Sequence, residues 1–182
     1  MRLLILTGCR RNEVGGMRRS ELSEDGETWS LPGERTKNGL AHIVPLPELA
    51  RAVIASVPQI DDNEHVFAVD GVRRVNGWAH IKGRLDATIA EAGAPLPGWT
   101  FHDCRRTVVT RMIETLGIRP DVVERLVNHV SGQSRAGVAG VYNRAEMLPQ
   151  RREALEAWAE HVRALVAGEA APSNVTRLRE HA

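Results

Sequence analysis

The sequence predicts a mainly α-helical domain with a small antiparallel sheet of two or three strands. Most of the chain shows amphipathic helical spacing, and strand-like residues are confined to 28–46. That short region also contains Asn38-Gly39, a turn signal. With 182 residues, of which 42% are hydrophobic and 26% charged, the chain can bury a core of its own.

Local signals give the expected element boundaries. Strands are expected over 28–32, 34–37 and 41–46, with Asn38-Gly39 as a tight hairpin because both residues tolerate positive φ. Helices are expected over 1–6, 10–22, 47–57, 77–92, 101–116, 120–129, a short stretch around 138–142, and 147–167.

The helix that begins after Thr100 is the most informative. Thr100 and Asp103 have the spacing of a capping box, and Gly117 is a stop signal. At about 100° per residue, His102 and Arg105 fall near the apolar stripe that contains Val109. A desolvated arginine requires an anion or an internal carboxylate. The helix start therefore predicts an anion site, with an internal carboxylate partner as the alternative.

Composition excludes several classes of protein. No apolar run approaches the roughly 20 residues that span a bilayer, and the two cysteines, Cys9 and Cys104, have no metal or disulfide spacing. We therefore expect no membrane segment, metal or other cofactor, and a cytoplasmic location. The net charge of +1 hides clusters of basic residues separate from acidic runs, which allows one basic face.

Five short motifs follow one another along the chain. They are Thr-Gly-Cys-Arg at 7–10 with Glu13, Lys37 before Val-Pro-Leu at 44–46, His102-x-x-Arg105, Leu-x-x-His at 126–129, and Tyr142. In this order and spacing they resemble the catalytic domain of the tyrosine recombinases, the phage integrase family. The resemblance covers roughly residues 3–145. One such motif is weak on its own, but five in order are specific.

The resemblance implies a role for each motif residue. Arg10 and Arg105 would hold the scissile phosphate, and His102 and His129 would hydrogen-bond it or assist proton movement. Lys37 would be the general acid for the leaving 5′-oxygen, and Tyr142 the nucleophile that forms a 3′-phosphotyrosine. Glu13 would be structural. Phosphoryl transfer builds charge on oxygen atoms, which arginine forks match in geometry.

The resemblance also implies an organisation and partners. Residues 1–167 would form a catalytic domain of the DNA breaking-rejoining fold, and 168–182 a disordered tail. The family's amino-terminal DNA-clamping domain would be missing. The implied partners are double-stranded attachment-site DNA and three further copies in a homotetramer, joined through the carboxy-terminal segment. The implied source is a bacterium or phage, with the protein associated with the nucleoid.

Departures from the family pattern and other functions stay open. Arg106 stands where a histidine is frequent, Arg19 where a tryptophan is common, and Gly15-Gly16 replaces apolar residues. The alternatives are a topoisomerase-like relaxing enzyme, a truncated fragment that only binds DNA or a partner integrase, and a metal-dependent nuclease that uses His102, Asp103 and His129. The stripe of Leu155, Trp158, Val162 and Leu165 fits docking on a neighbour or packing on its own domain equally.

Overall fold

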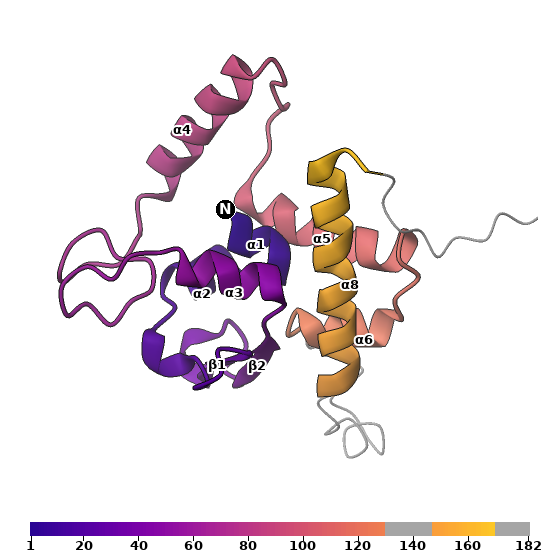
Figure 1. The fold of residues 1–182 in the computed structure, drawn as a ribbon, viewed down its shortest axis with the longest axis horizontal. Coiled ribbons are helices and arrows are strands. Elements are labelled where there is room, and N and C mark those ends of the chain that lie inside the picture. The colour runs from indigo at the N-terminus through magenta and orange to yellow at the C-terminus, as the bar shows by residue number, and fades with distance from the viewer. Residues whose placement is uncertain (130–146, 170–182) are drawn as a thin grey trace, which may run out of the picture.

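The computed structural model describes residues 1–129 and 147–169 of the chain. The described residues are mostly helical, and a small two-stranded sheet lies at the lower edge of the molecule in Figure 1, so the predicted mainly α-helical fold class is confirmed. The helices are α1 (Arg2–Thr7), α2 (Arg11–Gly15), α3 (Glu48–Ala55), α4 (Trp78–Glu91), α5 (Phe101–Glu114), α6 (Pro120–Leu126) and α8 (Leu148–Ala167). The strands are β1 (Thr28–Leu31) and β2 (His42–Pro45).

The core lies between α8 and the helices it crosses. Helix α8 contacts α1, α3, α5, α6 and β2, and Figure 1 shows it running across the body of the molecule. Leu155 and Trp158 are buried, and the Trp158 indole Nε1 donates a hydrogen bond to the Ile5 carbonyl at 2.7 Å. This part of the predicted stripe therefore packs on its own domain, whereas Leu165 is 59% exposed.

The sheet of the described residues has two strands, where two or three were expected. Strands β1 and β2 pair antiparallel, with Trp29 opposite Val44, and both of these side chains are fully buried. The expected strand at 34–37 is wrong, because Gly33–Arg35 forms a 3-10 turn. The prediction of a tight hairpin at Asn38-Gly39 is also wrong. Gly39 adopts a positive φ of 75°, but Asn38 does not, and its side chain instead bonds to Asn128.

The expected helix over 10–22 is interrupted after its first turns. Helix α2 ends at Gly15, and Arg19–Glu21 forms a separate 3-10 turn. A Cβ at Gly15 would lie 2.5 Å from Trp78 Cζ2, so the glycine permits a close approach of the indole. Glycine also weakens a helix, and together these facts explain why α2 stops here.

Helix α4 extends away from the body of the molecule (Figure 1) and buries none of its residues. Aromatic rings hold its base: the ring centroids of Trp78 and Phe101 are 5.3 Å apart, and those of Trp99 and Phe101 are 5.5 Å apart. None of the helices in the described ranges has the length and apolar character to cross a bilayer. The helix expected around 138–142 lies outside the described residues, and so do residues 170–182 of the tail expected over 168–182.

Strand β2 carries a buried histidine that is held neutral. The Nε2 of His42 donates to the Leu126 carbonyl at 2.9 Å, and Arg151 Nη2 lies 3.4 Å from Nδ1, which fits the tautomer with the proton on Nε2. Burial, followed by the charge of Arg151, lowers the pKa of His42 to about 4. Protonation of this ring would place a second charge beside Arg151.

We predict that Gly15→Ala lowers the free energy of unfolding by about 1–3 kcal/mol, because the new methyl group must displace the Trp78 ring. Chemical denaturation monitored by tryptophan fluorescence measures this change. The control is Gly83→Ala in α4, where a Cβ would meet no atom within 4 Å. It should leave stability unchanged or raise it by up to about 1 kcal/mol. Equal losses in both variants would contradict the steric explanation.

We predict that the stability contributed by neutral His42 is complete above about pH 6.5 and is lost as the pH falls towards about 4. In this window the unfolded histidine binds a proton and the folded one does not, so acid favours unfolding by an amount on the order of 3 kcal/mol. Unfolding free energies of the wild type and His42→Gln, measured from pH 7 to pH 4, test this. Parallel curves would show that His42 is not the group that titrates.

Candidate active site

The start of α5 has the cap that its sequence predicts. The backbone N–H of Thr100 and its hydroxyl both donate to Asp103 Oδ2 at 2.8 Å. The helix ends at Glu114, and Gly117 has a φ of 64°, close to the expected stop. Both ends of this helix are therefore encoded locally.

The buried face of α5 is rotated from the expected one. Its buried residues are Phe101, Arg105, Val108 and Met112, which centre the stripe about 60° away from Val109. The prediction that His102 faces the core is therefore wrong: His102 is exposed and lines an open pocket. Arg105 does lie in the buried stripe, where it is only 7% exposed.

Arg105 is held by backbone carbonyls rather than by an internal carboxylate. Its Nη1 donates to the Gly8 carbonyl at 2.8 Å, and its Nη2 donates to the Val127 carbonyl. Burial, followed by the nearby charge of Arg10, lowers the pKa of Arg105, which remains protonated at neutral pH. Within residues 1–129 and 147–169, Arg105 forms no ion pair. Its charge is thus fixed in place, and no carboxylate of these described ranges contacts it directly.

Arg10 lies at the start of α2 and is fixed by Glu13. The Arg10 backbone N–H donates to Glu13 Oε2 at 2.8 Å, and Arg10 Nη1 donates to Oε1 at 2.9 Å. The Glu13 side chain is almost fully buried, so the salt bridge is well shielded on one side. Burial raises the pKa of the neighbouring Cys9 thiol to about 12, which makes Cys9 a poor nucleophile.

Lys37 lies in the connection between β1 and β2, and its side chain is exposed. Two residues earlier, Arg35 donates to the Glu13 carbonyl at 2.8 Å and forms a salt bridge with Glu21. A Cβ at Gly16 would lie 2.8 Å from Arg35 Nη2. The glycine pair after the first motif therefore leaves room for Arg35 and Trp78.

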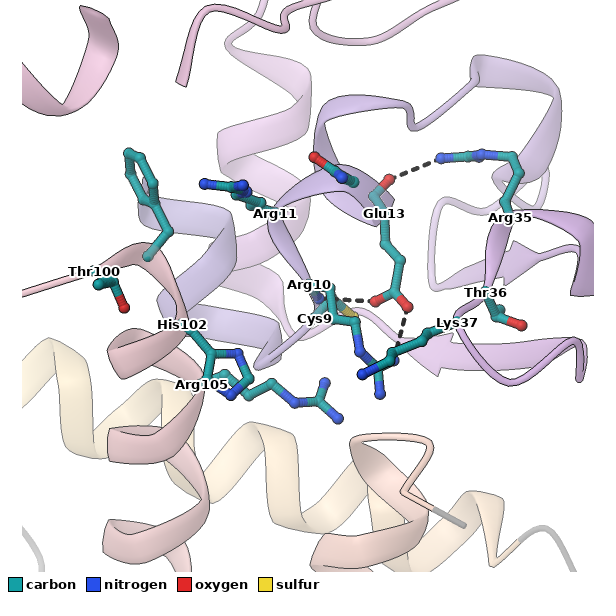
Figure 2. Close-up of a pocket in the computed structure, with 12 residues that line it drawn as sticks. Cys9, Arg10, Arg11, Glu13, Arg35, Thr36, Lys37, Thr100, His102 and Arg105 are labelled. Atoms are coloured by element: carbon teal, nitrogen blue, oxygen red, sulfur yellow. Dashed lines mark hydrogen bonds and ion pairs between the residues drawn. The ribbon is translucent and has the colours of Figure 1, made fainter. Parts of the chain in front are cut away.

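Four of the six predicted site residues line one pocket of about 530 Å³: Arg10, Lys37, His102 and Arg105. Figure 2 shows them on different segments around this space, with the ends of Arg10, Lys37 and Arg105 near its centre. Arg11 and Arg35 also line the pocket, and they were not predicted as site residues. A signal was present in the sequence, because Arg11 directly follows Arg10 and Arg35 lies two residues before Lys37. Among the described residues that line this pocket, Glu13 is the one carboxylate.

Of the other two predicted residues, only His129 is among the residues that the structure describes, and it is not in the pocket lining. His129 lies just after α6, where its exposed ring pairs through Nδ1 with Glu124 Oε2 at 2.6 Å. It is nevertheless only two residues beyond Val127, whose carbonyl binds Arg105. Tyr142 lies outside the described residues. No cluster of three metal-binding side chains occurs in the part of the chain that the structure describes, so His102, Asp103 and His129 do not form one.

Comparison with known proteins gives matches along most of the chain. Two prophage integrases of Escherichia coli strain K12 are similar: IntA is 27% identical over 177 residues, and IntZ is 28% identical over 173 residues. These matches cover 96% and 94% of this chain but only 41% of each relative. The chain therefore spans about two-fifths of the length of the curated relatives it matches.

A solved structure of the Tn1549 transposon integrase, in complex with circular intermediate DNA, has the same fold. It matches 80% of this chain and 55% of that chain, with a TM-score of 0.51 and 20% identity. The model of the phage integrase family matches residues 1–146. This range contains all five motifs and the described residues that line the pocket around Arg10 and Arg105. The chain therefore belongs to the phage integrase family.

Proposed function

We propose that this chain catalyses the cleavage and rejoining of DNA strands in the site-specific integration or excision of a mobile element. The observation that carries the proposal is the pocket in which Arg10, Lys37, His102 and Arg105 meet. These residues come from separate segments of the chain, yet they meet in one space. Membership of the phage integrase family and the similarity to two prophage integrases support the same function.

The ligand that fits this pocket is the scissile phosphate of DNA. Two guanidinium groups match the planar geometry of phosphate oxygens and can donate paired hydrogen bonds to them. Arg10 and Arg105 are already held by protein groups, so little reorganisation is needed when the phosphate enters. Each fixed donor of this kind contributes about 3–4 kcal/mol to transition-state stabilisation, by analogy with oxyanion holes.

The proposed reaction is a transfer of the phosphoryl group to Tyr142. The phenolic oxygen of Tyr142 attacks phosphorus, and the bond from phosphorus to the 5′-oxygen breaks. The Lys37 ammonium gives its proton to the leaving 5′-oxygen, while one of the two histidines, His102 or His129, accepts the phenolic proton. The reverse step, with a 5′-hydroxyl as nucleophile, reseals the strand without an external energy source.

The cations of the pocket supply the charge stabilisation that metal ions supply at many other phosphoryl-transfer sites. The proposed mechanism therefore requires no cofactor. The proposed partner is double-stranded attachment-site DNA, which is supported by the DNA bound to the Tn1549 integrase.

The proposed organisation comprises a catalytic unit over residues 1–167 and a homotetramer on DNA. The packing of α8 on α1, α5 and α6 supports the inclusion of this helix in the unit. Leu165 and Val166 are 59% and 85% exposed, and they offer apolar surface at the carboxy-terminal end of α8 for contact with another copy.

We predict that Tyr142→Phe abolishes covalent adduct formation with a nicked attachment-site duplex, because phenylalanine has no nucleophilic oxygen. The adduct is measured as a denaturant-resistant band that carries labelled DNA. Binding of the same duplex should change less than about threefold. An adduct that survives this substitution would refute the assigned nucleophile, and one that disappears with chelator would refute metal-independent chemistry.

We predict that Arg105→Lys lowers the rate of adduct formation about 10²–10³-fold, because a lysine cannot present two fixed donors to the phosphate. Arg111→Ala is the matched control on the same helix, since Arg111 is exposed and does not line the pocket. It should change the rate less than about threefold. Similar losses in both variants would indicate a general effect of charge on DNA binding instead of a specific site.

A further inference from the structure

We propose that Asn38 and Asn128 form a pair of positioning residues for Lys37, which joins the Lys37 loop to the segment that follows α6. The Lys37 loop is the connection over residues 32–41. The inference deepens the proposed function and rests on it, because it concerns the placement of the proposed general acid. It also explains why the Asn38-Gly39 sequence does not form the tight hairpin that it predicts.

The side-chain amide of Asn38 is a local centre of hydrogen bonding. Its Nδ2 donates to Asn128 Oδ1 at 2.9 Å and to the Asn128 carbonyl at 3.2 Å. Its Oδ1 accepts from Asn128 Nδ2 at 3.3 Å and from the Leu40 N–H at 3.2 Å. The Thr36 hydroxyl also lies 3.1 Å from Oδ1. One amide therefore fixes both flanks of Lys37 and connects them to a residue 90 positions later.

Asn128 is placed for this contact by its own backbone. Its φ of 50° is in the left-handed region, which asparagine tolerates better than most residues. The carbonyl of the preceding residue, Val127, accepts a hydrogen bond from Arg105 Nη2. The Lys37 loop is thus connected through Asn38, Asn128 and Val127 to the guanidinium group that we propose as a phosphate ligand.

Arg35 holds the other side of the loop. It binds the Glu13 carbonyl and the Glu21 carboxylate, and Glu21 also accepts from Trp29 Nε1 at 2.9 Å. The Lys37 loop is therefore attached to the Arg10 motif on one side and to the segment after α6 on the other. The exposed side chain of Lys37 lines the same pocket as Arg10 and Arg105.

A lysine depends on such support more than an arginine does. Its ammonium group is a point charge on a flexible four-carbon stem, so the backbone beneath it decides where the proton is delivered. Proton transfer requires a donor within hydrogen-bond distance of the leaving oxygen, and a misplacement of about 1 Å can cost on the order of 100-fold in rate. Loss of the asparagine pair should therefore impair proton delivery more than phosphate binding.

The first test uses two nicked attachment-site duplexes, one normal and one in which sulfur replaces the bridging 5′-oxygen at the scissile phosphate. A thiolate leaves without a proton, so the sulfur substrate bypasses the general acid. We expect Asn38→Ala and Asn128→Gly to slow adduct formation about 10–100-fold on normal DNA and less than about threefold on the sulfur substrate. Glycine at 128 keeps the positive φ accessible. Asn76→Ala, in which an exposed asparagine is removed, is the control.

These outcomes separate the inference from the proposed function. Equal losses on both substrates, or no loss on normal DNA, would overturn the positioning role while the proposed function stands. If the wild-type protein forms no adduct on either substrate, the proposed function itself fails, and the inference fails with it. Thermal melting of each variant checks that the fold is retained.

The second test measures Lys37 without catalysis. The sequence contains only two lysines, Lys37 and Lys82, so dimethylation with ¹³C gives few NMR signals and keeps the positive charges. Lys82 pairs with Asp86 and lies over the Trp99 ring, which makes it an internal reference. In the wild type, inorganic phosphate should shift the Lys37 signal saturably and leave the Lys82 signal unchanged.

In Asn38→Ala we expect the phosphate-induced shift of the Lys37 signal at saturation to fall by about half or more, while the apparent Kd changes less than about threefold. A Lys37 shift at saturation equal to that of the wild type would overturn the positioning role. A wild-type Lys37 signal that does not respond to phosphate would count against the anion pocket on which the proposed function depends.

Discussion

The hydrogen bonds of Arg105 to two backbone carbonyls are the contact on which the rest of the site depends. They join the buried face of α5 to Gly8, just after α1, and to Val127, just after α6. A carboxylate partner would fix this guanidinium equally well but would cancel its charge. Carbonyl partners provide direction and leave the charge available to an anion, which is the property that a phosphate site requires.

The carboxylates around the pocket have a structural role, because they hold its other guanidinium groups in position. Glu13 fixes Arg10 and Glu21 fixes Arg35, and both carboxylates are largely buried. Glu21 accepts hydrogen bonds from both Arg35 and Trp29, and these largely buried bonds form one connected network. The cations at the pocket are thereby held in position, and Arg105 contributes a positive charge that no described carboxylate pairs with.

Membership of the phage integrase family and the geometry of the pocket support each other. The family match covers the described residues that line the pocket, and the pocket brings together the cations that the proposed phosphoryl transfer would use. The same logic explains why Cys9 is an unsuitable nucleophile despite its place in the lining. Burial raises the pKa of its thiol to about 12, so the reactive thiolate is scarcely populated at neutral pH.

Much of the fold, and four residues of the candidate site, could be predicted from short stretches of the sequence. The Thr100–Asp103 cap, the limits of α5 and α8, and the position of the small sheet follow from residues close together in the chain. The identities of Arg10, Lys37, His102 and Arg105 as site candidates could also be predicted, because their motifs occur in a characteristic order.

The tertiary structure decided which partners these residues have. It assigned backbone carbonyls to Arg105, and it assigned Asn128 to Asn38, where the local sequence favoured a hairpin. It also rotated the buried face of α5, so that His102 lines the pocket and does not enter the core. Such outcomes depend on contacts between segments up to 97 residues apart, and the periodicity of a single segment carries no information about them.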